Sequence, residues 1–198
     1  MNWLFGSVLT FQLERDVFLR EQANNLYSPG AYFLAKNLVE TPVALLTPMV
    51  QLLVMYWGLD YVNFFEVYII MAILCQCAMG IGLTISSIAP NVTTATTIAP
   101  AFTMPMILFG GLFANTDTMP KWLSWLQWIS PIRYTNEAMA HSQFDGVHTS
   151  PPDFPAQFLE YSGFTIGLWN CLAIMCGLTV FWRIFSLVIL RLQIKKVQ

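Results

Sequence analysis

Charged side chains gather in one stretch of this 198-residue chain, residues 14–42, which lies between two apolar runs. Within it, Ser28-Pro29-Gly30 ends one helix and begins the next. The helix before this break is short and carries charged and apolar residues at helical spacing: Glu14, Arg15, Asp16, Arg20 and Glu21 among Leu13, Val17 and Phe18. These charges must be solvated by water, contact lipid headgroups or bind a protein, and we expect a cytosolic protein partner.

Groupings typical of catalysis or metal binding do not stand out in the sequence. We find no Gly-rich phosphate loop of the Walker type and no Ser-His-Asp grouping. The two histidines, His141 and His148, have no second ligand type at useful spacing. All four cysteines lie inside apolar runs, where buried thiols are expected rather than metal ligands or disulfides: Cys75, Cys77, Cys171 and Cys176. We therefore predict no metal site, no cofactor on this chain and no ATP hydrolysis by it alone.

The composition is that of a membrane protein. Hydrophobic residues make up 56% of the chain and charged residues 10%, whereas about a quarter of the residues of a soluble domain are charged. The mean hydropathy of +0.57 agrees with a polytopic membrane protein. No basic patch suggests nucleic acid, so we expect none as a partner.

A membrane span takes about 20 residues. Residues 1–13 are apolar but shorter, so we expect the cytosolic half of a helix whose start is missing. A signal peptide is disfavoured, because the charge follows the apolar run. Four complete spans are predicted: residues 31–57, 64–88, 92–114 and 164–190. The expected fold class is all-α, a polytopic helical membrane domain of about five spans with the first partial.

Polar and small residues inside the spans carry further expectations. Lys36 and Glu40 are one helical turn apart, and we expect Lys36 to extend towards the headgroups. Gly80 and Gly82 leave room for a neighbouring helix to approach closely. Arg183 either extends to the inner face or pairs with Glu66 or Glu40, and we favour the first.

Residues 115–163 form the longest polar stretch and are expected to make a small cap. Trp122, Trp125 and Trp128 recur at three-residue spacing, which suits a helix at the membrane interface; the alternative is that they form the core of the cap. Most Lys and Arg residues fall on the opposite side of the spans from this loop. The positive-inside rule therefore makes residues 14–27 and the C-terminal tail cytosolic and the cap non-cytosolic. The sequon Asn91-Val92-Thr93 is then cytosolic and unused.

Several runs, in order along nearly the whole chain, resemble the G-type, or White-type, subfamily of ATP-binding cassette (ABC) transporters. The first set comprises Glu14, Arg15, Phe18, Arg20, Glu21, Tyr27, residues 32–34, Lys36, Glu40 and Pro42. The later runs are residues 107–115, 122–126 and 133–137. The resemblance implies that residues 14–27 are a cytosolic coupling helix. The residues that carry the coupling are then Glu14, Arg15, Arg20 and Glu21.

The same resemblance implies the partners. In that subfamily a nucleotide-binding domain carries ATP and Mg, and two halves dimerise around a central pathway in the lipid bilayer. We therefore expect the membrane part of an ATP-driven exporter of lipid-like or amphipathic molecules, in the plasma membrane or a vesicle membrane. The alternative is a non-transporting dimerisation or regulatory subunit. A membrane-embedded enzyme is disfavoured, because the spans hold no catalytic polar cluster.

The uncharged span, residues 92–114, is the candidate pathway wall. One stripe along it holds Thr97, Ala101, Met104 and Ile107, and a similar stripe on the opening helix holds Asn2, Phe5 and Leu9. By resemblance these stripes line the pathway; the alternative is a dimer interface without a cavity. Gly110 and Gly111 weaken the end of this span. By resemblance Leu112 and Phe113 then form an apolar gate, with simple packing under the cap as the alternative.

Overall fold

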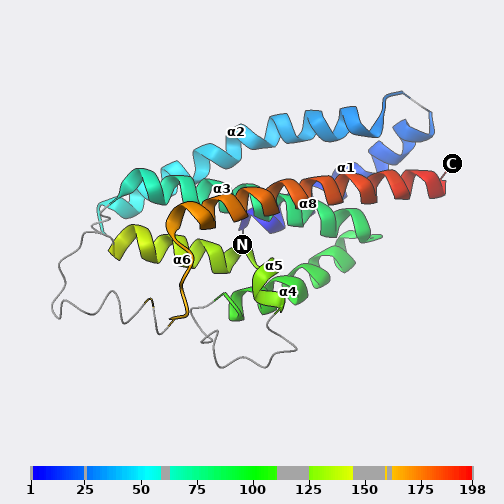
Figure 1. Cartoon of the computed structure of the whole chain (residues 1–198). Helices are drawn as coiled ribbons and strands as arrows, with labels where there is room; N and C mark the ends of the chain where they lie inside the picture. The colour runs from blue at the N-terminus through cyan, green and yellow to red at the C-terminus, as the bar shows by residue number, and fades with distance from the viewer. Residues whose placement is uncertain are drawn as a thin grey trace. The chain divides into compact units, whose positions relative to one another are not determined.

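The computed structural model describes residues 2–24, 26–58, 63–110, 125–144, 159 and 162–197. Every regular element among them is a helix (Figure 1). The helices are α1 (Asn2–Ala23), α2 (Pro29–Tyr56), α3 (Phe64–Ile88), α4 (Val92–Leu108), α5 (Trp125–Ile129), α6 (Pro131–Phe144) and α8 (Leu168–Val197). The predicted all-α fold class is confirmed.

Three of these helices are long and apolar enough to cross a membrane: Pro29–Tyr56, Phe64–Ile88 and the Leu168–Ile194 part of α8. The shorter helix α4, 17 residues long, is also apolar. The predicted span 92–114 ends as a helix at Leu108, and residues 111–114 lie outside the described residues. The chain is therefore an integral membrane protein.

The first residues of the spans are set by side-chain caps. Ser28 Oγ accepts a hydrogen bond from the backbone N–H of Ala31 at 3.2 Å, and Pro29 occupies the first turn of α2, where its missing N–H costs nothing. Asn91 caps α4 in the same way, accepting the N–H of Thr94 at 2.9 Å. Helix α8 begins at Leu168 rather than at the predicted residue 164. A turn precedes it, with Gly163 at φ 68°, a conformation that suits glycine.

Helix α1 runs without interruption for 22 residues. The expected partial span, residues 1–13, and the charged segment after it are therefore parts of one helix. No helix-breaking residue occurs where they meet, at Leu13 and Glu14. The helix ends near Arg20 and Glu21, whose carbonyls accept the N–H groups of Asn24 and Leu26, each at 3.2 Å. Residues 14–23 are thus the C-terminal part of a longer rod, and a force on them acts on the whole of α1.

The chain divides into two compact units. Unit 1 comprises Met1–Thr47, Cys75–Ala101 and Thr179–Gln198, and unit 2 comprises Pro48–Leu74 and Phe102–Leu178. The core of unit 1 is formed by Phe11, Phe18, Leu83, Leu190 and Ile194. The core of unit 2 is formed by Ile70, Tyr134, Ala138, Cys171 and Met175.

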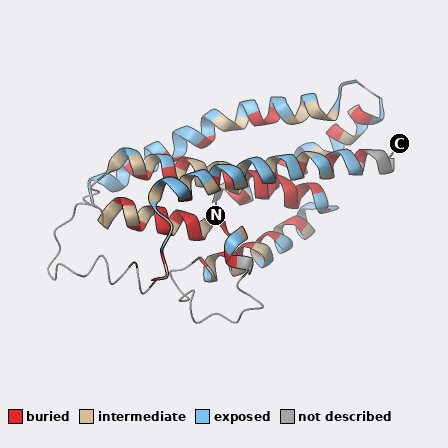
Figure 2. Cartoon of the chain, in the orientation of Figure 1, coloured by how far each residue is buried: buried red, intermediate tan, exposed pale blue. Residues whose placement is uncertain are grey.

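Within unit 1, one stretch of α3 is buried on all sides: the residues from Met79 to Ser87 form one unbroken buried run (Figure 2). Its hydroxyls bond to neighbouring backbones, as Ser86 Oγ does to the carbonyl of Val8 on α1 at 2.9 Å. The expected close approach at Gly80 and Gly82 is confirmed. A Cβ on Gly80 would lie 3.1 Å from Trp182 Cβ, and one on Gly82 would lie 2.6 Å from the carbonyl oxygen of Leu4.

The Gly82 contact leads to a stability prediction. The obstacle at Gly82 is backbone, so Gly82→Ala must displace α1 from α3. We expect a loss of about 1–3 kcal/mol, measured as a lower midpoint of thermal unfolding of the purified protein in detergent. Gly6→Ala on α1 is the matched control, because a Cβ there meets nothing within 4 Å. That control should be neutral or stabilise α1 by up to about 1 kcal/mol. Equal midpoints for the two variants would contradict the close contact.

Candidate functional site

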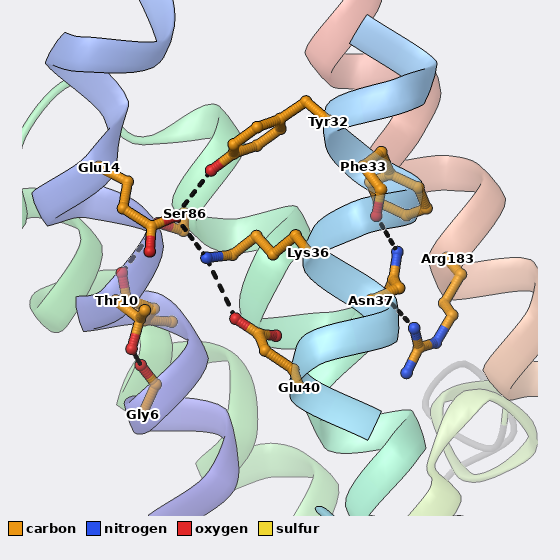
Figure 3. A network of polar contacts seen from close by, with 11 residues as sticks. Gly6, Thr10, Glu14, Tyr32, Phe33, Lys36, Asn37, Glu40, Ser86 and Arg183 are labelled. Atoms are coloured by element: carbon orange, nitrogen blue, oxygen red, sulfur yellow. Dashed lines mark hydrogen bonds and ion pairs between the residues drawn. The ribbon is translucent and has the colours of Figure 1, made fainter. Parts of the chain in front are cut away.

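An ion cluster joins α1 to α2 within unit 1 (Figure 3). The ammonium of Lys36 lies 2.7 Å from Glu14 Oε2 on α1 and 3.1 Å from Glu40 Oε1 on its own helix. The hydroxyl of Tyr32 also donates to Glu14 Oε2, at 2.8 Å. The expectation that Lys36 extends to the headgroups is wrong, since its side chain is only 6% exposed. The two carboxylates supply the counter-charges that a buried ammonium requires.

Glu14 is held in its ionised form by this cluster. Partial burial opposes ionisation, but the hydrogen bonds from Lys36 and Tyr32 outweigh it and lower the pKa of the Glu14 carboxyl. A carboxyl with a lowered pKa stabilises the fold above its ordinary pKa. That contribution disappears as the pH falls through the lowered value. At neutral pH the Glu14–Lys36 pair is therefore intact.

Arg183 on α8 is bound by amides rather than by carboxylates. Its guanidinium donates to Asn37 Oδ1 on α2 and to Gln76 Oε1 on α3. The prediction that Arg183 extends to the inner face is wrong, and so is direct pairing with Glu66 or Glu40. Asn37 is itself oriented by a 2.8 Å hydrogen bond from its Nδ2 to the carbonyl of Phe33. Figure 3 shows Asn37 pointing towards Arg183, while Lys36 and Glu40 point towards α1.

Asn37 and Gln76 were not among the residues singled out from the sequence. The signal for them was available, because a polar side chain inside an apolar span marks a helix contact or a functional site. Periodicity does not indicate their shared partner, Arg183, because it lies more than 100 positions away in the sequence.

Aromatic rings pack the turn between α1 and α2. The ring centroids of Phe18 and Tyr32 are 4.4 Å apart, and Tyr27 stacks on Tyr32 at 6.1 Å. The Tyr27 hydroxyl donates to Glu21 Oε2 at 2.6 Å. Burial and the neighbouring Glu21 raise the pKa of Tyr27 to about 12. The turn is therefore a packed elbow, formed by residues 14–24 and 26–32 and held by rings as well as by charges.

The four predicted coupling residues divide into two groups. Three are bound within unit 1: Glu14 to Lys36 and Tyr32, Glu21 to Tyr27, and Arg15 through Nη1 to the carbonyl of Pro90 at 2.7 Å. Arg20 is exposed and makes no ion pair with the described part of the chain. Gln12, which was not predicted, adds hydrogen bonds to the carbonyls of Ser86 and Ala89, at 2.7 and 3.2 Å.

Arg20 lies on an exposed stripe of the elbow. Leu13 is 77% exposed and Val17 56% exposed, and with Arg20 they recur at four and three residues, on one side of α1. Phe18, expected on the same docking helix, is instead buried in the core of unit 1. We call Leu13, Val17 and Arg20 the docking stripe, an apolar pair beside a cation with no cover from unit 1.

The predicted pathway stripe on α4 is uncovered in this chain. Thr97, Ala101 and Met104 are exposed and Ile107 is partly buried. The hydroxyl of Thr97 bonds back to the carbonyl of Thr93 at 2.9 Å, so the helix satisfies it without a partner.

On α1, Leu9 is 41% exposed and Phe5 partly buried, while the side chain of Asn2 lies outside the described residues. The predicted gate, Leu112 and Phe113, also lies outside them, as do Trp122 and the side chain of Trp125. The pathway and the gate remain predictions.

In unit 2, side chains from α6 and from the residue before it cap the end of α4. Ser130 Oγ donates to the carbonyl of Met106 at 3.0 Å, and Asn136 Nδ2 donates to the carbonyl of Gly110 at 2.8 Å. The Met106 carbonyl is one that the end of α4 leaves without an internal partner, whereas Gly110 lies two residues after that helix ends. Unit 2 therefore holds the last turn of α4 and a residue two positions before the predicted gate.

Helix α6 buries a carboxyl that links it to the segment before α8. Glu137 is fully buried and accepts the backbone N–H of Ile166. Burial raises the pKa of Glu137, although that hydrogen bond and nearby Arg133 act in the opposite direction. Arg133 places its guanidinium 5.0 Å from the ring centroid of Trp128. The segment before α8 is thus anchored to α6 by a buried acceptor.

Comparison with known proteins places these features in a family. The sequence model of the ABC-2 type transporter family matches residues 1–144. The ABC transporter ATP-binding protein/permease wht-1 of Caenorhabditis elegans is 32% identical over 168 residues, covering 82% of this chain and 25% of that protein. ABC transporter G family member 1 of Dictyostelium discoideum is 29% identical, covering 89% and 25%. Protein white of Drosophila melanogaster is 31% identical, covering 73% and 22%. The chain thus spans about a quarter of the length of these relatives.

The ion cluster leads to a second stability prediction. Lys36→Met leaves two carboxylates without their cation. A fully buried pair broken in this way costs about 3–5 kcal/mol. Because the Glu14 side chain is 47% exposed, we expect about 2–3 kcal/mol after screening by solvent, measured by thermal unfolding in detergent at pH 7.

The double variant Lys36→Met/Glu14→Gln should recover part of this loss, since one unpaired carboxylate is gone. Arg20→Met is the matched control, an exposed cation whose removal should change stability by less than about 0.5 kcal/mol. A Lys36→Met variant as stable as this control would show that the cluster does not hold α1 to α2.

Proposed function

The chain belongs to the ABC-2 type transporter family, and from this premise we propose that it is the membrane-spanning part of an ATP-driven exporter of lipid-like or amphipathic molecules. Its relatives are ABC transporter G family and White proteins, which confirms the resemblance found in the sequence. We further propose that it acts with a nucleotide-binding domain and with a second half-transporter. ATP and Mg would bind to that domain, whereas this chain supplies the route across the bilayer.

The observation that carries the proposal is that the inner and outer sides of the elbow differ in their contacts. Its inner side is fixed by Glu14, Arg15 and Glu21, each of which bonds to another part of unit 1. Its outer side presents the docking stripe. A helix whose inner side is bonded to unit 1 and whose outer side is exposed suits the transmission of force, because a push on the docking stripe moves α1 as a rod.

The contacts of α1 indicate where such a movement would go. A movement of α1 would reach α2 through Lys36. It would reach the end of α3 through Gln12, which bonds to the carbonyls of Ser86 and Ala89. It would reach the turn before α4 through Arg15, which bonds to the carbonyl of Pro90. We propose that closure of the nucleotide-binding domains reaches the spans through these contacts. In this proposal the docking stripe contacts the nucleotide-binding domain. The other three predicted coupling residues, Glu14, Arg15 and Glu21, position the elbow.

The coupling proposal is tested by charge reversal. In a transporter that joins this domain to a nucleotide-binding domain, Arg20→Glu should reduce substrate-stimulated ATP turnover and transport by about tenfold or more. The reason is that a desolvated charge across an interface is worth about 2–5 kcal/mol when its partner is lost. Arg191→Glu, at an exposed arginine of α8 that lies beside Gly30 and off the docking stripe, is the matched control and should keep normal coupling.

If Arg20→Glu behaves like Arg191→Glu, the stripe does not dock, since an exposed pair is worth at most about 1 kcal/mol. A domain that binds its partner but never stimulates ATP turnover would instead favour the non-transporting regulatory subunit.

The pathway proposal is tested by accessibility. In a background without the four native cysteines, Thr97→Cys and Met104→Cys should react with a charged, aqueous thiol reagent in at least one nucleotide state. Leu38→Cys on α2 is the control for a side chain exposed to lipid; Leu38 is 65% exposed and should remain unlabelled. If both α4 cysteines are unreactive in every nucleotide state, this face is a dimer interface without a cavity.

A further inference from the structure

The last turn of α4 is only weakly joined to the rest of its own helix. Pro105 has no N–H, so one of the backbone hydrogen bonds that would tie this turn to the turn before it is missing. Helix α4 ends at Leu108, and beyond it the N–H of Gly110 bonds back to the carbonyl of Ile107 at 3.1 Å. Contacts from outside α4 therefore have a large part in deciding where residues 105–110 lie.

Two side chains at the start of α6 supply such contacts. Ser130, which is fully buried just before α6, donates to the carbonyl of Met106 at 3.0 Å. Asn136 Nδ2 donates to the carbonyl of Gly110 at 2.8 Å. A serine at the start of a helix commonly accepts an N–H of that helix, whereas the hydroxyl of Ser130 donates to α4. The last turn of α4 is thus bonded to the α6 region at Met106 and again just after the helix ends.

The bond to Gly110 depends on the absence of a side chain there. Gly110 is buried, and a Cβ at this position would lie 2.8 Å from Ile132 Cγ2 and 3.3 Å from Asn136 Nδ2. A Cβ essentially never approaches another heavy atom to within 3.0 Å, so any larger residue would push Ile132 away. The same residue would press on the Asn136 amide. Glycine therefore lets α6 reach the backbone of α4 directly.

We propose that Ser130 and Asn136 are positioning residues for transport, which hold the last turn of α4 and thereby set the place of Ile107 on the pathway stripe. Both bonds go to backbone carbonyls, so they fix the main chain and do not occupy the side chain of Ile107. The inference rests on the proposed function, because it gives α6 a role in a pathway along α4. The hold on α4 itself exists in the chain alone and can be measured there.

The first test is amide hydrogen exchange on the full chain in lipid nanodiscs, followed in peptides that cover residues 106–110. Asn136→Leu keeps nearly the same shape and removes the donor. We expect exchange in these peptides to become about fivefold to tenfold faster, the factor that corresponds to the net loss of one hydrogen bond. The matched control is Asn63→Leu, because Asn63 Nδ2 also donates to a backbone carbonyl, that of Ser142 near the other end of α6. It should leave exchange at 106–110 unchanged.

Two further variants test the same hold by other routes. Gly110→Ala should displace the amide of Asn136 and accelerate exchange to a similar extent. Adding Ile132→Ala removes the obstructing methyl group and should restore part of the protection. Ser130→Ala removes the second donor and should accelerate exchange at Met106, so the hold can be tested even if Asn136→Leu does not fold.

The functional test uses a transporter that joins this domain to a nucleotide-binding domain. Asn136→Leu should lower the number of substrate molecules moved per ATP hydrolysed by about fivefold, within the range over which indirect contacts modulate coupling. ATP turnover without substrate should stay unchanged. A merely structural role would lower transport and ATP turnover together, through loss of folded protein, and would leave their ratio as it was.

Unchanged exchange at 106–110 in both Asn136→Leu and Gly110→Ala would overturn the hold on α4. Faster exchange with an unaltered ratio of transport to ATP turnover would overturn the role in transport. A parent transporter that moves no substrate would contradict the proposed function and this role with it, whereas the exchange measurement would still decide whether α6 positions the end of α4.

Discussion

An ammonium that is almost fully removed from water must have anions beside it, and in this protein that requirement falls on Lys36. Glu40 supplies one carboxylate from the same helix, and Glu14 supplies the second only when α1 packs beside α2. The cost of leaving a charge unpaired in a low-dielectric environment is large compared with most single contacts. The association of α1 with α2 therefore has a specific register, set by one ion cluster rather than by apolar packing that other registers could also satisfy.

The rest of the elbow follows from that register. Once Glu14 is in place, Tyr32 lies within hydrogen-bonding distance of it and in ring contact with Phe18. The same placement of α1 leaves Gln12 and Arg15 on the side where the carbonyls at the end of α3 and in the turn after it need donors. One face of α1 is buried by these contacts, and the docking stripe lies exposed on the other face. The bare stripe is thus a consequence of the way the inner face is fixed.

Much of this arrangement could be predicted from the sequence, and the failures share one cause. Hydropathy and local caps determine where the helices lie, so the all-α membrane fold and the restart at Pro29 were predictable. Gly80 and Gly82 signalled a close approach because small residues in a span let a neighbouring helix come near. The partners of Lys36 and Arg183 could not be predicted. Lys36 was considered only with its neighbour one turn away, whereas Glu14 is 22 positions distant, and the amides that bind Arg183 are 107 and 146 positions away. The division of α1 into an inner and an outer face likewise depends on contacts that periodicity does not reveal.

The position of Glu40 one turn after Lys36 has a consequence for the biogenesis of the protein. A lone lysine at the centre of a membrane helix costs about 2.5–3.5 kcal/mol on insertion scales. Helix α2 carries its counter-ion with it, one turn away. The segment that enters the bilayer is therefore neutral overall, whether or not α1 has docked.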